Sequence, residues 1–392
     1  MTLPSDLKEF INNNLKQDIN NLALKKNPFA NYEWSWILNQ IQAKQKAEKK
    51  LPTWFSNEDV IFPSTLSIEQ TSSETLAKFK AELISGEKLI DLTGGFGVDD
   101  YYFAKRFKKV VHCEFQEDLS AIVQHNFKVL NADNIETVSG DSISYLKQST
   151  ENFDWIYIDP ARRDDKKTKV FLLKDCTPNV VELQEFLFER SDHILIKVAP
   201  LLDISSILNE LDNVKAIYAI GLHNEVKELL IVLEKDFINQ PELIAVNISN
   251  DGIIHQDIFP LNDAADSQLS LPLNYLYESF SSYLKIGVYN DIATKFNVNK
   301  LHKHSHLYTS NELVDFAGRC FKIEQIIPYN KKDIKFLENT KCNITTRNFP
   351  LKVEEIRKKH KIKDGGDLYA FFTTDLNNDK IVVLCKKTTT DN

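Results

Sequence analysis

Five polar side chains stand at or directly after the ends of predicted strands. They are Asp91, Glu114, Asp141, Asp159 and Lys197. The carboxyl ends of parallel strands lie at one edge of a sheet, and open α/β folds bind their ligands there. We therefore expect the five side chains to surround a single ligand. The alternative is structural, with each side chain capping the helix that follows its strand.

A glycine-rich turn follows the first of these strands. Residues 91–97 read Asp-Leu-Thr-Gly-Gly-Phe-Gly, and residues 88–114 as a whole predict a strand, this turn, a helix and a second strand. Glycine lets the backbone turn sharply and lets a ligand approach without a Cβ in the way. Thr93, Gly95 and Gly97 are therefore candidates for holding a nucleoside cofactor. Glu114 can accept hydrogen bonds from both hydroxyls of its ribose.

The residues after the turn favour one cofactor over another. The dinucleotide fingerprint requires a third glycine, but Asp100 stands where that glycine would be. Asp99 and Asp100 also place two carboxylates at the start of the helix, where they would repel a pyrophosphate. S-adenosylmethionine carries a sulfonium cation and no phosphate, so acidic surroundings suit it. The pattern thus predicts S-adenosylmethionine.

Two further segments are candidates for binding this cofactor. Asp141, followed by Ser142, ends the third predicted strand and could accept the exocyclic amine of an adenine. Gln70 and Ser73 belong to a polar cluster just before the first strand, which could line the carboxylate end of the cofactor. The cluster could instead serve only to cap the next helix, because Thr71-x-x-Glu74 is a capping box.

The whole-chain numbers describe an ordinary globular protein. The 392 residues have a net charge of −8, with 42% apolar residues, and no apolar run could span a bilayer. The N-terminus lacks a secretory signal, and five scattered cysteines predict reduced thiols in a cytoplasmic protein. His302, His304 and His306 alternate, but no carboxylate or cysteine stands beside them, so we predict no metal.

The order of predicted elements gives an α/β fold with four parts. Residues 1–75 are predicted to be a helical region, whose tryptophans Trp34, Trp36 and Trp54 pack it onto the next domain rather than stacking on bases. Residues 76–236 alternate strands and helices and end in a hairpin, which predicts six parallel strands and one antiparallel strand. Small α+β domains are expected at 237–328, beginning with a hairpin at 242–258 and a helix at 275–288, and at 329–392. Lysine and arginine outnumber acidic residues after residue 330, which suggests an anionic partner.

These features together resemble a known family. The resemblance covers nearly the whole chain. It is carried by residues 67–74, 91–99, 159–163, 197–203, 224–228, 306–310 and 347–351. They are similar to class I S-adenosylmethionine-dependent methyltransferases with a C-terminal THUMP-like domain. The resemblance implies a Rossmann-like sheet, a ferredoxin-like domain at 237–328, and a THUMP-like, RNA-binding domain at 329–392. It therefore implies an RNA substrate, tRNA or rRNA. The sequence carries no indication of oligomeric state.

The fourth strand ends in Asp159-Pro160-Ala161-Arg162, which is where methyl transfer would occur. In related amine methyltransferases a D/N-P-P-Y/F sequence holds the N–H and stacks on the base; here the second proline and the aromatic residue are missing. We predict that Asp159 orients the acceptor, with Arg162 and Lys197 as further catalytic residues. Substrate contacts are expected from Arg162, Arg163, Asn224 and Arg347. A structural alternative pairs the two neighbouring arginines with Asp164 and Asp165.

Three other functions remain open from the sequence. Methylation at C5 of a pyrimidine would need a cysteine nucleophile, and Cys176 is the only nearby candidate. The chain could methylate a small molecule or a protein, or it could be a cofactor-free RNA-binding protein on the same fold. A dinucleotide oxidoreductase is disfavoured by Asp100 and by the final hairpin of the sheet.

Overall fold

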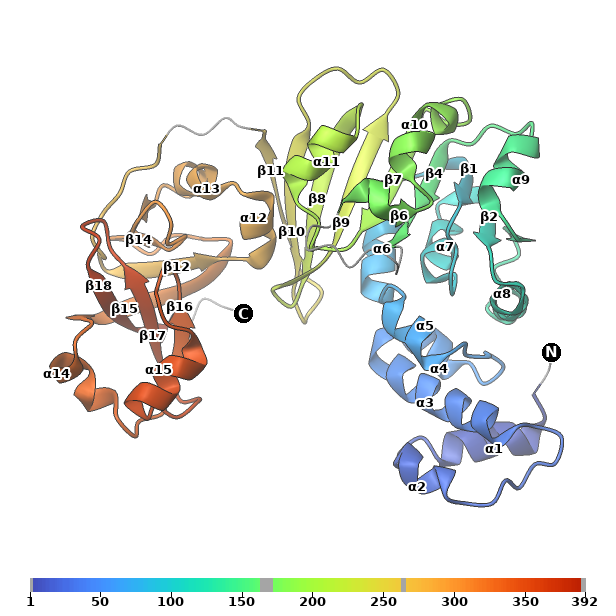
Figure 1. The fold of residues 1–392 in the computed structure, drawn as a ribbon, viewed down its shortest axis with the longest axis horizontal. Helices are drawn as coiled ribbons and strands as arrows, with labels where there is room; N and C mark the ends of the chain where they lie inside the picture. Colours follow the sequence, from blue (N-terminus) through green and yellow to red (C-terminus); the bar gives the residue numbers. More distant parts are fainter. Residues whose placement is uncertain (1–2, 163–171, 262–265, 389–392) are drawn as a thin grey trace. The chain divides into compact units, whose positions relative to one another are not determined.

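The computed structural model describes residues 3–162, 172–261 and 266–388. The chain forms two compact units, whose helices and strands are labelled in Figure 1. One unit comprises Met1–Val214 and Ile231–Ile238, and the other comprises Lys215–Leu230 and Asn239–Asn392. Arg163 and the charged residues at 164–169 lie outside the described residues.

The first unit begins with six helices, so the helical prediction for its N-terminal residues is confirmed. They are α1 (Ser5–Asn13), α2 (Ile19–Ala23), α3 (Trp34–Lys50), α4 (Pro52–Ser56), α5 (Thr65–Gln70) and α6 (Glu74–Leu83). Trp34 and Trp36 pack against the core that α1, α2 and α3 share, and Trp54 is fully buried. The Trp54 ring lies 5.0 Å from that of Tyr101, so the tryptophan does pack the helical region onto the next segment.

Residues 65–70 form helix α5, because the Ser64 side chain accepts the Ser67 N–H and starts a helical turn. One local prediction after this helix is wrong. Helix α6 is capped by Ser73, whose hydroxyl accepts the N–H of Leu76, and not by Thr71. Serine and threonine are both good N-caps, so composition alone did not decide between them.

The large sheet has nine strands in the order β11-β10-β8-β9-β7-β4-β1-β2-β3. Its strands are β1 (Gly86–Asp91), β2 (Phe107–Glu114), β3 (Ile135–Ser139), β4 (Trp155–Ile158), β7 (His193–Val198), β8 (Val214–Leu222), β9 (Glu225–Glu234), β10 (Glu242–Ile248) and β11 (Ile254–Pro260). Strands β3, β2, β1, β4 and β7 run parallel. The two-residue turn between β8 and β9 makes that pair antiparallel. This arrangement confirms the predicted Rossmann-like sheet.

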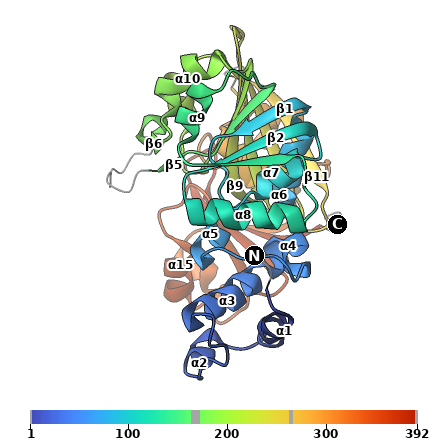
Figure 2. The ribbon, with the colours of Figure 1, turned by 90° about the vertical axis from the view of Figure 1, so that its right-hand side faces the viewer.

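Short helices follow most of the parallel strands. They are α7 (Val98–Phe103), α8 (Glu117–Val129), α9 (Ser142–Gln148), α10 (Val180–Phe188) and α11 (Ile204–Glu210). Helix α8 packs against β2 and β3, and Figure 2 shows it lying roughly along the strands of the sheet. The loop after β4 contains the small strand β5 (Ala161–Arg162), which pairs with β6 (Cys176–Thr177) after the short 3-10 helix η1 (Leu173–Asp175).

Strands β10 and β11 correct the sequence-based domain plan. The plan assigned this hairpin to the domain at 237–328, but β10 pairs in parallel with β8 and thereby extends the large sheet. Residues 243–248 of β10 are all buried, as in a strand covered on both faces. The hairpin turn is a local signal and was predicted correctly. The pairing of β10 with β8 is non-local, so the turn could not reveal it.

A seven-stranded sheet dominates the second unit, in the order β13-β14-β12-β15-β18-β17-β16. Its strands are β12 (Tyr275–Ser279), β13 (Asn299–Lys300), β14 (Tyr308–Ser310), β15 (Gly318–Pro328), β16 (Asn343–Thr346), β17 (Leu368–Thr374) and β18 (Lys380–Lys387). The helices are α12 (Ser281–Ile286), α13 (Tyr289–Lys295), α14 (Lys331–Ile334) and α15 (Val353–His360), with the 3-10 helix η2 (Lys335–Leu337).

This sheet corrects two further predictions. Strand β15 pairs with both β12 and β18, so the proposed boundary at 328/329 cuts through one continuous sheet. Residues 275–288 were predicted to be helical, yet the segment begins with strand β12. That strand lies between β14 and β15, where pairing on both sides satisfies its backbone groups and overrides local helical preference.

Candidate active site

The strand order brings the predicted polar side chains to one edge of the sheet. Asp91 and Glu114 are the last residues of β1 and β2, Asp159 directly follows β4, and Lys197 is the next-to-last residue of β7. Asp141 caps α9, which follows β3. The five strands lie side by side and parallel in the order β3-β2-β1-β4-β7. Their carboxyl ends therefore form one edge, as the sequence predicted.

The glycine turn is fixed by packing at two positions and open at a third. A Cβ on Gly94 would stand 2.1 Å from the His112 ring, and a Cβ on Gly97 would stand 2.5 Å from the Phe127 ring. Gly95 has a φ of +56°, and among the described residues only the Thr93 carbonyl oxygen comes within 4 Å of its ideal Cβ, at 3.8 Å. Gly94 and Gly97 thus allow close packing inside the protein, whereas Gly95 leaves space beside the strand ends.

Hydrogen bonds from the acidic side chains hold this turn. Asp91 accepts the backbone N–H of Thr93 at 2.7 Å and its hydroxyl at 3.0 Å. Glu114 accepts the backbone N–H groups of Gly95 at 3.0 Å and Gln116 at 2.8 Å. The Glu114 carboxylate is therefore aimed at the open glycine, and its oxygens keep lone pairs for further hydrogen bonds.

The third strand ends in a helix cap. Asp141 accepts the backbone N–H of Ile143 at 3.0 Å and the hydroxyl of Ser144 at 2.8 Å. The Ser144 hydrogen bond lowers the pKa of Asp141 below its ordinary value. Asp141 is exposed and Ser142 is half-buried as the first residue of α9. The capping alternative therefore applies to Asp141, although its exposed carboxylate can still accept from a ligand.

Beneath the turn lies a buried cluster that the sequence analysis did not identify. His112 Nδ1 lies 2.5 Å from the Asp100 carboxylate, and both side chains are inaccessible to solvent. Burial raises the pKa of Asp91 well above its ordinary value, and the nearby Asp100 raises it further. Burial also raises the pKa of Asp100 and lowers that of His112. These shifts favour neutral groups, which suits a structural support for the turn.

A second network connects Asp159 to the protein interior. Lys197 Nζ lies 2.5 Å from the Asp159 carboxylate and 3.3 Å from the Ser72 hydroxyl. The Asp159 backbone N–H donates to the Thr93 hydroxyl at 2.7 Å. The Asp159 side chain is 39% exposed, whereas that of Lys197 is 11% exposed. The carboxylate therefore faces the open edge while the lysine holds it from behind.

Asp99 is the centre of the network behind Lys197. It accepts hydrogen bonds from Ser72 at 3.0 Å and Tyr157 at 2.8 Å, and it forms an ion pair with Lys80 at 3.1 Å. Burial alone would raise the pKa of Asp99, but the Lys80 and Lys197 ammonium groups bring it below the ordinary value. Two lysines and two carboxylates thus share this region.

The remaining predicted cofactor residues lie close in sequence to this network. Gln70 ends α5 and is exposed, and Ser73 caps α6. Between them stands Ser72, a member of the same polar cluster, whose hydroxyl forms hydrogen bonds with Lys80, Asp99 and Lys197. The polar cluster therefore does reach the strand edge, through Ser72.

The predicted substrate residues have different surroundings. Arg162 is exposed on β5, close in sequence to Asp159, whereas Arg163 lies outside the described residues. Asn224 belongs to the second unit, where its side-chain oxygen accepts the Ser281 N–H at 2.8 Å. Arg347 pairs at 2.7 Å with the buried carboxylate of Glu278. These contacts give Asn224 and Arg347 structural roles, and their part in substrate binding stays a prediction.

Cys176 and the alternating histidines have structural surroundings. Cys176 is fully buried, and its Sγ lies 3.8 Å from the Leu172 carbonyl oxygen, a poor position for a nucleophile. Nowhere in residues 3–162, 172–261 and 266–388 do three or more His, Cys, Asp or Glu side chains form a group that could hold a metal ion. The His306 ring instead stacks on Tyr289, with centroids 3.8 Å apart.

Comparisons with known proteins agree with this geometry. A family model described as a ferredoxin-like domain matches residues 275–316, and one described as THUMP domain-like matches residues 318–387. A crystal structure of a candidate methyltransferase from Porphyromonas gingivalis W83 matches with a TM-score of 0.87 and 28% identity, covering 99% of this chain and 100% of that one. The chain has a class I methyltransferase fold with a C-terminal THUMP-like domain.

One curated relative has a name that states an activity. An uncharacterized RNA methyltransferase of Mycoplasma mobile is 26% identical over 174 residues, which are 43% of this chain and 46% of that protein. The chain thus spans less than half of the length of this relative. In the part of the chain that the structure describes, every helix is too short or too polar to cross a bilayer.

Proposed function

We propose that this protein is an S-adenosylmethionine-dependent methyltransferase that modifies RNA, with tRNA or rRNA as the substrate. The observation that carries the proposal is the edge formed by β3, β2, β1, β4 and β7. Acidic side chains and one lysine surround an open glycine at this edge. All five cysteines are buried thiols, which agrees with a reducing, cytoplasmic location.

The residues at the edge suit S-adenosylmethionine. Gly95 leaves space for close approach, and Glu114 lies beside it with acceptor capacity for ribose hydroxyls. The exposed Asp141 carboxylate can accept an adenine amine, and the partly exposed Asp159 carboxylate faces the open edge. Asp91 and Thr93 would act by shaping the turn. When bound, the cofactor supplies a methyl group activated by positively charged sulfur.

The chain's own contribution is to position the acceptor. Methyl transfer needs alignment of donor and acceptor in a dry site more than it needs covalent catalysis. The Asp159 carboxylate can accept the N–H of a nucleobase amine and hold it in place, because Lys197 fixes the carboxylate from behind. Arg162, exposed three residues later, can stack on a base or bind a phosphate.

RNA is the substrate class that the rest of the chain favours. The THUMP-like match covers residues 318–387, and basic residues exceed acidic ones in the tail although the whole chain is acidic. The Mycoplasma mobile relative, named as an RNA methyltransferase, points the same way. Arg162 and Arg163, together with Asn224 and Arg347, are our candidates for contacts to this RNA.

Two measurements test the proposal. Calorimetry of the full chain with S-adenosylmethionine should show binding, and Glu114→Gln should weaken it because an amide offers only one acceptor oxygen. Mass spectrometry of RNA from a deletion strain should reveal one methylated nucleotide lost relative to the parent. Donor binding with no lost RNA mark would point to a small-molecule or protein substrate. Absence of binding heat at high protein concentration would point to a non-catalytic RNA-binding protein.

A further inference from the structure

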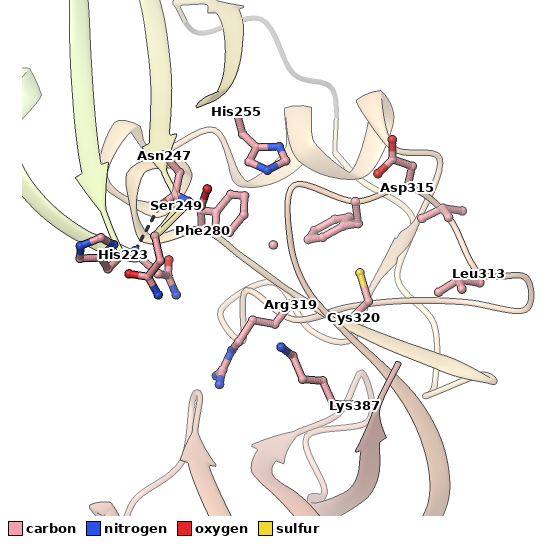
Figure 3. A pocket seen from close by; sticks show the side chains of 15 residues that line it. His223, Asn247, Ser249, His255, Phe280, Leu313, Asp315, Arg319, Cys320 and Lys387 are labelled. Carbon is pink, nitrogen blue, oxygen red and sulfur yellow. Dashed lines mark hydrogen bonds between the residues drawn. The ribbon is translucent and has the colours of Figure 1, made fainter. Parts of the chain in front are cut away.

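The second unit contains a cavity that the proposed methyl-transfer site does not use. Its volume is about 650 Å³, within the range of pockets that enclose small ligands. Figure 3 shows that its lining side chains come from several separate segments of this unit. These segments are the β8–β9 turn, the β10–β11 hairpin, Phe280, the 313–320 segment and the end of β18.

One wall consists of polar groups held in a tight hairpin turn. His223 and Asn224 have φ values of 55° and 62°. This is the left-handed backbone conformation that the two central residues of a two-residue hairpin turn adopt. The turn is anchored because the His223 N–H donates to the Ile248 carbonyl, and the Asn224 N–H donates to the Asn247 side chain at 3.2 Å. This anchoring holds the exposed His223 ring and the amide groups at the cavity.

A second part of the lining is aromatic. Phe280 is half-buried, with its ring 5.3 Å from that of His255 and 6.3 Å from that of Tyr283. Its position is therefore set by neighbours from β11 and α12. An aromatic ring held in this way is a platform on which a nucleobase can stack.

A third part of the lining is cationic. Lys387 on β18 pairs with Phe321 on β15, and Arg319 lies two residues before Phe321. Since residues two apart share one face of a strand, Arg319 and Lys387 leave the same face at diagonal positions. Arg319 also pairs with Glu278, but Glu278 is shared with Arg347, so two guanidinium groups face one carboxylate.

We propose that this cavity binds one unpaired nucleotide of the RNA substrate. The base stacks on Phe280 and presents its edge to the amide and imidazole groups, while a phosphate lies near Arg319 and Lys387. A nucleotide combines a flat aromatic ring, an edge of donors and acceptors, and an anion, which match the three parts of the lining. A paired base could not enter, because its edge and both faces are occupied. The inference rests on the proposed function.

The test uses matched variants of the full chain. Lys387→Glu reverses a charge at the cavity, and Lys386→Glu makes the same change on the opposite face of β18, where Lys386 lies near Glu324. Phe280→Leu removes the ring but keeps apolar bulk, whereas Phe280→Tyr keeps the ring. Binding of a labelled single-stranded RNA oligonucleotide, and of the same RNA annealed to its complement, is measured by fluorescence anisotropy. Melting temperatures confirm that the variants fold.

We expect Phe280→Leu to weaken single-strand binding by about 5- to 150-fold, the range for losing one stacked base, and Phe280→Tyr to bind like the wild type. Lys387→Glu should weaken binding and reduce its salt dependence, while Lys386→Glu should change it much less. Equal effects of the two lysine variants, or unchanged binding by a folded Phe280→Leu protein, would overturn the inference.

The results also separate this inference from the proposed function. Wild-type protein that binds and methylates RNA, with Phe280→Leu fully active in both, removes the cavity from the RNA path and leaves the enzyme proposal intact. Wild-type protein that binds S-adenosylmethionine but neither form of RNA contradicts the RNA substrate itself, and the cavity inference falls with it.

Discussion

Gly95→Ala is the substitution that most directly probes the proposed donor site. Gly95 stands between two glycines that interior packing requires, yet its own ideal Cβ meets no atom closer than 3.8 Å. A methyl group there would enter the space beside Glu114, where we place the ribose. The protein should therefore still fold, while the affinity for S-adenosylmethionine should fall.

The expected cost to folding follows from the backbone. Gly95 has a φ of +56°, and placing a Cβ in the left-handed region costs about 1–2 kcal/mol. For a unit of this size, that corresponds to a fall in melting temperature of roughly 2–8 °C. Blocking close approach of the donor should cost at least about 1.4 kcal/mol of binding free energy, which is a tenfold loss of affinity.

Gly252→Ala is the matched control. Gly252 lies in the turn between β10 and β11, has a φ of +84°, and likewise has no atom near its ideal Cβ. Its backbone strain is comparable, but it belongs to the second unit. Calorimetry should show wild-type donor affinity for Gly252→Ala and reduced affinity for Gly95→Ala at similar melting temperatures. Wild-type affinity in a folded Gly95→Ala protein would refute the placement of the donor beside this turn.

Three further predictions concern single side chains. Asp159→Asn should slow methyl transfer by about 10²-fold, measured in single-turnover assays, and an unchanged rate would exclude Asp159 from acceptor positioning. Burial raises the pKa of Asp100, so its stabilising contribution is complete below about pH 4 and is lost as pH rises. The melting temperature of Asp100→Asn relative to wild type should therefore rise with pH, and a constant difference would contradict the shift. Burial lowers the pKa of His306 to about 4, so its neutral form stabilises fully above about pH 6.5 and this contribution is lost as pH falls toward 4. His306→Phe retains a ring on Tyr289. Between pH 6.5 and 5 its free energy of unfolding, measured in urea, should fall by about 1 kcal/mol less than that of the wild type, and an equal fall in both proteins would contradict the prediction.

The sheet edge could be predicted because its signals are local. Each of Asp91, Glu114 and Asp159 ends or directly follows a short apolar strand, and the alternation of strands and helices implies parallel neighbours. Parallel strands place like ends together, so sequence position was enough to bring these side chains to one edge. Seven strands of the sheet followed from this pattern.

The pairing of distant segments could not be predicted in the same way. β10 reads as half of a hairpin with β11, and that reading is correct. Its second partner is β8, and nothing within β10 specifies which free sheet edge it joins. Likewise, β15 reads as one strand, although it joins two segments that sequence had separated. Strands pair through backbone hydrogen bonds, so the side-chain sequence says little about which distant strand is the partner. Errors in the predicted domain boundaries follow from this.

The network behind Lys197 had a signal that could have been used. Lys80 lies on the face of α6 that also buries Leu76 and Ala77, one turn earlier. A lysine at a core position is rarely left without a partner, since burying an unpaired ammonium is costly. Asp99 was noted only as an obstacle to pyrophosphate, yet it is the carboxylate that satisfies this lysine. The buried Lys80 and the nearby Asp99 could therefore have been predicted to form an ion pair.

The network also explains how Asp159 can pair with Lys197 and still bind a substrate. Lys197 and Lys80 together balance Asp159 and Asp99, so the region carries no net charge when all four groups are ionised. Because the Asp99 carboxylate also attracts the Lys197 ammonium group, Lys197 interacts with two carboxylates and not with Asp159 alone. The Asp159 carboxylate keeps its exposed side for a substrate N–H, held in place at its inner oxygen. The charged groups of Lys80, Asp99 and Lys197 therefore fix the position of the Asp159 carboxylate, which faces the open edge.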